Sequence, residues 1–172
     1  MMTIINKILH QPRLLNLTGF VICVAAMLFA VMYLQGVLYL NPCPLCIVDR
    51  VLISMMAGIF LLAAIHNPVS KIRLVYAGSN LLLVIAAFLV GARHVWLQHL
   101  PPDQVPECGA GLAFMLDVLP LWEVVTKVFT GSGECAEVQW QFLGLSIPEQ
   151  TLILFSGLLV LVVYLLILKP EE

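Results

Sequence analysis

The chain has 172 residues, of which 62% are hydrophobic and only 10% are charged, and its mean hydropathy is +1.04. A soluble domain carries roughly a quarter charged residues, so this chain has too little polar surface to cover a globule in water. Its 8 basic and 10 acidic residues nearly balance, which leaves nucleic-acid binding without electrostatic support. The composition therefore predicts a membrane protein.

Four apolar runs follow in chain order, and each approaches the ~20 residues that cross ~30 Å of hydrocarbon. We expect transmembrane helices at about residues 15–38, 46–65, 73–92 and 150–168, with outer loops at about 39–45 and 97–148. No run alternates with a period of two, which disfavours a barrel. A secretory signal is the alternative for the first run, but its apolar core is too long and no small-residue cleavage site closes it. We predict one all-α membrane domain over residues 1–172, a four-transmembrane-helix bundle.

Basic residues decide the orientation of this bundle. Lys7 and Arg13 precede the first run, Lys71 and Arg73 separate the second from the third, and Lys169 follows the fourth. Lys and Arg near the spans favour the cytoplasm. We therefore expect a multi-pass protein with both termini and the short middle loop cytoplasmic, and with the short turn at 39–45 and the long segment 97–148 outside.

Four of the five cysteines fall on the outer side. Cys43 and Cys46 lie where the first outer loop meets the second span, and Cys108 and Cys135 lie in the long outer loop. Disulfides persist in such an oxidising compartment. Cys23, deep in the first span, is expected to pack as a small hydrophobe and has no assigned role.

Cys43 and Cys46 form a C-x-x-C motif at a helix start, where amide groups and the helix dipole favour a thiolate, most directly at Cys46. Arg50 lies one turn deeper on the same face. It could stabilise that thiolate or an anionic acceptor, although Asp49 could instead neutralise it. Alternatives for the pair are a structural disulfide or half of a zinc site, but a zinc site would want a second closely spaced ligand pair.

Cys108 and Cys135 are 27 positions apart. Prolines before Cys108 keep residues 101–106 extended, which suits a partner protein lying alongside. The glycine-containing stretch 131–134 is expected to be flexible and to let Cys135 move between partners. The alternative is an inert staple of the loop. Between the two cysteines, residues 112–129 are expected to lie on the membrane surface as a short interfacial helix, or else to form the core of the loop.

His94 ends the third span at about the depth of Arg50. A solvated interfacial histidine is the ordinary explanation. A thiol pair nevertheless needs an electron acceptor, and the chain has no nucleotide-binding, haem or iron–sulfur motif. A lipid-soluble quinone would reach this position from the bilayer. Arg50 and His94 would then hydrogen-bond its carbonyl oxygens.

These residues resemble bacterial disulfide bond formation protein B, DsbB, over essentially the whole chain. The matching features are Cys43-Pro-Leu-Cys46 followed by Arg50, the Arg-His-Val-Trp-Leu-Gln segment with His94, Cys108 after a proline-rich run, and Gly-Glu-Cys-Ala-Glu-Val-Gln-Trp-Gln-Phe-Leu-Gly-Leu around Cys135.

The resemblance implies a relay in the bacterial inner membrane. A reduced DsbA-like periplasmic thioredoxin-fold protein attacks a Cys108–Cys135 disulfide at Cys108. Cys135 then exchanges with Cys43, and the Cys46 thiolate passes the electrons to ubiquinone or menaquinone. The DsbA–DsbB–quinone relay is itself the known means of keeping the periplasm oxidising. The resemblance also implies a monomer in membrane lipid, a quinone site with Arg50 and His94, and no metal.

Two other functions remain open. One is a non-enzymatic membrane protein whose disulfides only brace its outer loop. The other is a quinone-linked thiol oxidoreductase of the vitamin K epoxide reductase type, which shares a four-helix quinone site. In that family the C-x-x-C lies on a late helix, whereas here it follows the first span.

Overall fold

The computed structural model describes residues 11–68, 71–101, 103–106 and 112–168. The elements in chain order are α2 (Pro12–Leu28), the π-helix η1 (Phe29–Gln35), α3 (Pro44–His66), α4 (Lys71–Gln98), α5 (Leu112–Val118), α6 (Leu121–Thr130), α7 (Gly133–Ala136), β1 (Gln141–Phe142), β2 (Leu145–Ser146) and α8 (Ile147–Ile167). Within this described part, four helical segments are long and apolar enough to cross a membrane: Pro12–Gln35, Pro44–His66, Lys71–Gln98 and Ile147–Ile167. The predicted four-helix membrane bundle is confirmed.

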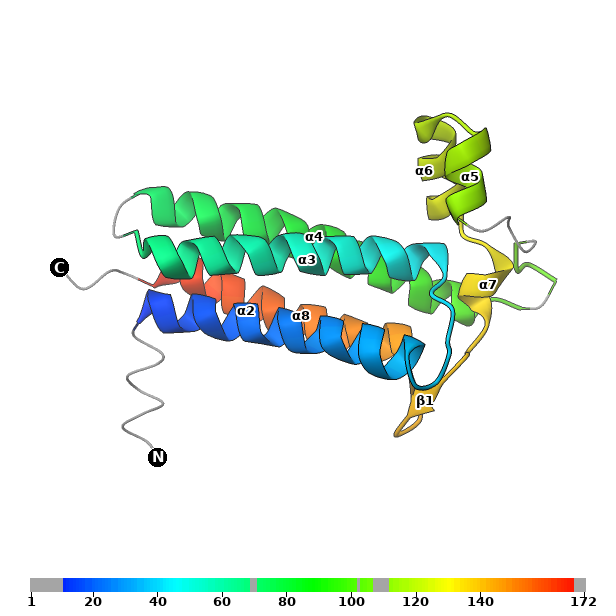
Figure 1. The fold of residues 1–172 in the computed structure, drawn as a ribbon, viewed down its shortest axis with the longest axis horizontal. Helices are drawn as coiled ribbons and strands as arrows, with labels where there is room; N and C mark the ends of the chain where they lie inside the picture. The colour runs from blue at the N-terminus through cyan, green and yellow to red at the C-terminus, as the bar shows by residue number, and fades with distance from the viewer. Residues whose placement is uncertain (1–10, 69–70, 102, 107–111, 169–172) are drawn as a thin grey trace.

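The four long helices pack side by side (Figure 1). α2 packs on α3, α3 on α4 and α4 on α8, whereas contacts between α2 and α8 are much sparser. α2 begins and α8 ends at one end of the bundle, and α5, α6, α7 and the β1–β2 hairpin gather at the other end (Figure 1). Because α2 and α8 barely touch, the bundle is most open between them.

Local sequence explains where the helices around the site begin. Pro44 occupies the first turn of α3, and the residue before a proline is pushed out of the helical region. Cys43 accordingly has an extended backbone, with φ −67° and ψ 164°, and forms the N-cap of α3. At α8, the backbone N–H of Ser146 donates to the Glu149 carboxylate over 2.7 Å, as part of a capping box. The Ser146 hydroxyl donates to Gln98 and so ties α8 to α4.

The segment expected as one interfacial helix is broken into α5 and α6, because Pro120 has an extended backbone and forms the N-cap of α6. Both helices run across the long axis of the bundle (Figure 1), as helices lying along a membrane surface would. Trp122 is exposed, whereas Val124 and Val128 are buried, so one face of α6 also serves as loop core. Arg93 of α4 donates to the last carbonyls of α6, which holds the pair on the bundle.

A buried cluster joins this outer segment to the bundle end. It contains the sulfurs of two cysteines, together with side chains of α3, α4, α5 and α6: Cys43, Leu45, Val90, Leu97, Met115, Val124, Val128 and Cys135. A separate larger cluster fills the middle of the bundle and contains Cys23, which is fully buried there. The outer cysteines are therefore held in a hydrophobic core of their own.

Candidate functional site

The first turn of α3 brings two sulfurs together. The Sγ atoms of Cys43 and Cys46 lie 3.0 Å apart. The backbone N–H of Cys46, one of the free amides of the helix start, donates to the Cys43 sulfur over 3.4 Å. The side chain of the N-cap, Cys43, thus folds back over the amides of the helix start, and the Cys46 sulfur is in turn hydrogen-bonded to the backbone of Cys43. The expectation that the helix start favours a thiolate most directly at Cys46 stays a prediction.

Cys135 reaches the same place from the outer segment. It lies in α7 and is fully buried, its sulfur 3.7 Å from the Ser132 hydroxyl. The backbone N–H of Leu45, in the first turn of α3, also donates to this sulfur. The stretch 131–134, expected to be flexible, instead ends α6 and starts α7 in the structure. Cys135 is thus packed onto the α3 helix start, in contact with Cys43.

The three sulfurs form a row in which Cys43 is the middle member. Its single thiol proton can be shared with Cys135 or with Cys46, and these interactions, together with burial, raise the pKa of Cys43 well above its usual range. The bond from Cys43 is also the main cause that lowers the pKa of Cys135 to about 6, aided by the Leu45 and Ser132 amides and opposed by burial. The lowered pKa favours the thiolate form of Cys135 in the reduced protein, and thiolates are the nucleophiles of disulfide exchange.

His94 of α4 lies beside the row of sulfurs. Its Nε2 lies 3.6 Å from the Cys43 sulfur, and the ring also hydrogen-bonds to the backbone of Cys135. Only 3% of the residue is exposed, so the solvated interfacial anchor considered from the sequence is excluded. His94 contacts both cysteines that meet across the α3–α7 junction.

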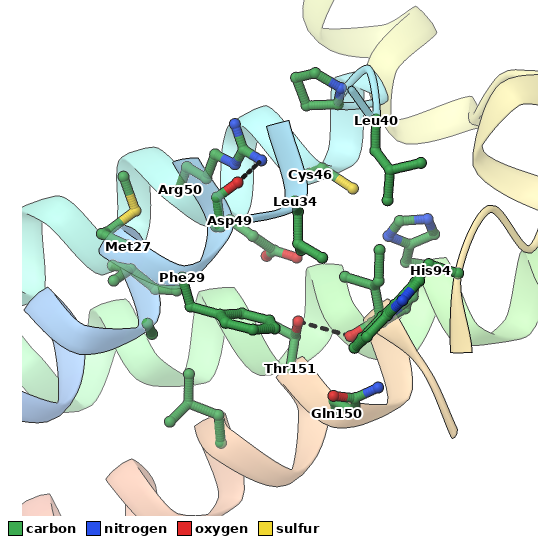
Figure 2. Close-up of a pocket in the computed structure, with 18 of the residues that line it drawn as sticks. Met27, Phe29, Leu34, Leu40, Cys46, Asp49, Arg50, His94, Gln150 and Thr151 are labelled. Atoms are coloured by element: carbon green, nitrogen blue, oxygen red, sulfur yellow. Dashed lines mark hydrogen bonds between the residues drawn. The ribbon is translucent and has the colours of Figure 1, made fainter. Parts of the chain in front are cut away.

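A cavity of about 170 Å³ opens beside Cys46. Figure 2 shows Cys46, Asp49 and Arg50 from α3, His94 from α4, and Gln150 and Thr151 from α8 around it. Residues of α2 and η1 form the opposite wall, so the cavity lies between these elements, the first turns of α3 and the start of α8.

Arg50 and Asp49 do not neutralise each other in the described part of the chain. The Arg50 guanidinium donates to the Gln35 side chain and to the backbone carbonyl of Ala30, the latter over 3.3 Å. Asp49 is 5% exposed, and its Oδ1 has no hydrogen-bond partner among the described residues. A buried carboxyl oxygen without a partner is costly. Asp49 therefore marks the cavity as a place for a ligand that offers or shares a hydrogen bond.

Aromatic rings line the side of the cavity near η1. Trp140 packs against Phe29 and Tyr33, with ring centroids 6.1 and 6.4 Å apart, and Phe29 and Trp140 both face the cavity. The π-helix widens the backbone where these rings and the Ala30 carbonyl meet it, and such π-segments are frequent at functional sites. Apolar walls with a guanidinium, an imidazole and a carboxyl fit a flat ring bearing carbonyl oxygens.

Sequence reasoning missed several of these groups. The sequence suggests Asp49 only as a partner of Arg50 and indicates no role for Gln35, Phe29 or Trp140. The π-helix has no recognisable sequence signal. Asp49 could have been noticed as an acidic residue inside an apolar run, where an ionisable group is a functional candidate by default. Cys108 lies outside the described residues, so its place relative to Cys135 stays a prediction.

Comparison with known proteins places this site in a family. The family model described as "Disulfide bond formation protein DsbB" matches residues 12–165. The chain is 50% identical over 154 residues to disulfide bond formation protein B of Psychrobacter sp. (strain PRwf-1), covering 86% of each protein. It is 54% identical over 137 residues to the protein of the same name from Nitrosococcus oceani, covering 80% of each. A third relative of that name, from Psychrobacter arcticus, is 50% identical over 156 residues, 89% of this chain and 88% of the relative.

Proposed function

The chain belongs to the DsbB family of disulfide bond formation proteins, and we propose that it is a multi-pass membrane oxidoreductase. It forms disulfides with a membrane quinone as the electron acceptor. Its protein substrate is a DsbA-type thioredoxin-fold dithiol of the periplasm. The net reaction converts the partner's two thiols into a disulfide. Two electrons and two protons leave through the cysteine pairs of this chain.

The row of sulfurs is the observation that carries the proposal. Cys43 contacts Cys135 on one side and Cys46 on the other, and Cys46 alone of the three lines the cavity. A structural brace needs one bonded pair, not a third sulfur within reach. The order Cys135, Cys43, Cys46, cavity is what a stepwise relay requires.

The steps follow from disulfide exchange. The partner thiolate attacks Cys108 of a Cys108–Cys135 disulfide, which forms a mixed disulfide and releases Cys135. The Cys135 thiolate attacks the Cys43 sulfur of a Cys43–Cys46 disulfide, and Cys46 leaves as a thiolate beside the cavity. The partner's second thiol then resolves the mixed disulfide, Cys108 displaces Cys43 from Cys135, and the pair Cys43 and Cys46 holds the two electrons.

The groups around the cavity have distinct tasks in this proposal. A bound ubiquinone or menaquinone takes up two electrons and two protons. The Arg50 guanidinium, oriented by Gln35 and the Ala30 carbonyl, donates hydrogen bonds and stabilises negative charge. His94 touches Cys43 and borders the cavity, so it holds the thiol pair against the acceptor. Asp49, whose Oδ1 has no hydrogen-bond partner among the described residues, would take up a proton from Cys46.

The orientation proposed from the basic residues agrees with this chemistry. Lys71 and Arg73 lie in the first turn of α4, and α4 begins at the end of the bundle opposite α7 (Figure 1). We place that end in the bacterial cytoplasm, with both termini, and the cysteine pairs in the periplasm, where the partner is found.

The test uses purified protein, a reduced DsbA-type partner and a water-soluble short-chain quinone. Partner oxidation and loss of quinone absorbance should proceed together and stop in Cys46→Ser, because the electrons no longer reach the cavity. Cys23→Ala removes a buried thiol remote from the route and should keep turnover. Cys108→Ala should form no mixed disulfide, whereas Cys135→Ala should accumulate one. Turnover that survives Cys46→Ser, or a complex trapped through Cys43, would refute the relay.

A further inference from the structure

Two sulfurs and one imidazole converge at the outer end of α3 and α4. Cys43, Cys46 and His94 each offer one ligand atom, and these atoms all lie within 4.8 Å of one another. Cys43 and His94 are buried, and Cys46 is half-buried beside the cavity. We propose that the fully reduced protein binds one zinc ion through these three residues and that this ion inhibits the enzyme.

The observed separations match a tetrahedral zinc site. With Zn–S of ~2.3 Å and Zn–N of about 2.0 Å, a tetrahedral ion requires about 3.6 Å between a sulfur and a nitrogen ligand and about 3.8 Å between two sulfurs. The Cys43 sulfur lies 3.6 Å from the His94 Nε2. The two sulfurs lie 3.0 Å apart, so they need to separate by less than about 1 Å, which a small side-chain rotation of Cys46 provides.

The surroundings orient the imidazole as metal sites do. A ligating histidine commonly uses its other ring nitrogen to hydrogen-bond a backbone carbonyl or carboxylate, which fixes the ring and its tautomer. His94 has a hydrogen bond to the backbone of Cys135, which holds the ring beside the two sulfurs. Cys46 borders the cavity, so water can reach the ion from that side and complete its coordination.

Zinc would bind the Cys43–Cys46 pair only in its reduced, dithiol form. Binding replaces the two thiol protons of Cys43 and Cys46, which are released, and no electron is transferred. A Cys43–Cys46 disulfide has no thiolate to offer, so the oxidised protein lacks the site. Zinc therefore holds the pair in the reduced form. This inhibitory consequence rests on the proposed function, whereas the binding itself does not.

The binding test uses the full-length protein without a histidine tag, in detergent, with Zn²⁺ competed against a chromophoric chelator and neither partner nor quinone present. The dithiothreitol-reduced, desalted protein should bind one equivalent tightly, and the oxidised protein should bind at least 100-fold more weakly. Cd²⁺ should produce a thiolate charge-transfer band in the reduced protein only. The double variant Cys108→Ala with Cys135→Ala should retain the site, because it keeps all three ligands.

Substitution of ligands completes the test. His94→Ala should weaken binding at least tenfold and Cys46→Ser more, whereas Cys23→Ala, which removes a thiol outside the cluster, should match the parent. Equal affinity of reduced and oxidised protein would overturn the proposal, as would an unchanged affinity in both His94→Ala and Cys46→Ser. Since the titration involves no turnover, a failed relay and a failed zinc site are separate results.

Discussion

Gly131 positions Cys135, and its replacement gives the sharpest test of the site geometry. The residue ends α6 with φ +90°, a conformation that side chains with a Cβ rarely adopt. A Cβ added there would also lie 2.6 Å from Cδ1 of Leu97, and Leu97 is fully buried in the outer cluster. Gly131→Ala should therefore push α7 and Cys135 away from Cys43.

The cost of Gly131→Ala has two parts. Gly131 also has ψ 157°, a region that is essentially restricted to glycine, so the backbone strain is roughly 1–3 kcal/mol, and overpacking against a buried leucine adds about 1–3 kcal/mol. The sum, about 2–6 kcal/mol, is relieved when α7 moves. Since every ~1.4 kcal/mol is tenfold in an equilibrium constant, the effective concentration of Cys135 at Cys43 should fall at least about 30-fold.

The assay measures that effective concentration directly. In a Cys46→Ser, Cys108→Ala background, the fraction of Cys43–Cys135 disulfide is determined across a glutathione redox series. Gly144→Ala is the matched control: its φ is +80°, but nothing lies within 4 Å of its added Cβ. The control should stay within about threefold of the parent. If the two variants behave alike, Gly131 does not hold Cys135 in place through Leu97.

Three further predictions concern charge, ligand affinity and stability. Because the pKa of Cys135 is lowered to about 6, chiefly by Cys43, its thiolate should form as pH rises through about 6 and be lost below it. The difference in thiolate absorbance between the reduced protein and Cys135→Ala should show this midpoint, and Cys43→Ala should move it upward; a fixed midpoint would contradict that cause. Arg50→Ala should raise the apparent KM for quinone roughly 10- to 100-fold, because the loss of a charged hydrogen bond costs about 1.5–3 kcal/mol. The rate of partner oxidation at saturating quinone should change much less. If the apparent KM for quinone is unchanged in Arg50→Ala, Arg50 only anchors α3 at the membrane interface. Ser146→Ala removes the N-cap hydroxyl of α8 and its bond to Gln98, so the apparent Tm should fall by a few degrees for a loss of about 1 kcal/mol; no fall would show that α8 does not depend on this cap.

Local properties of the chain account for what could be predicted. Hydropathy over about 20 residues reports the cost of exposing a segment to water or lipid, so the four spans follow from composition alone. The extended Cys43 before α3 follows from Pro44, because a proline restricts the residue before it. The break between α5 and α6 at Pro120 had the same kind of local signal. The apolar pattern of residues 112–129 nevertheless favours one continuous helix, and this pattern conflicts with the signal from the proline.

Packing between helices places Cys46, Asp49 and Arg50 of α3 across the cavity from η1. Nothing within α2 signals that its last turns become a π-helix, or that the Ala30 carbonyl and Gln35 take the hydrogen bonds of Arg50. The same packing leaves Asp49 Oδ1 without a partner in the described part of the chain. These features depend on which helices are neighbours, and hydropathy carries no information about neighbours.

The sequence by itself determined four membrane spans, a C-x-x-C at a helix start and a second pair of outer cysteines. Only the tertiary structure decided that His94, 51 positions from Cys43, lies 3.6 Å from its sulfur, and that Cys135 is buried against the same residue. The physical reason is that hydropathy and turn chemistry act along the chain. The meeting of sulfurs from α3 and α7 is instead set by side-chain packing in the outer cluster, which no local pattern encodes.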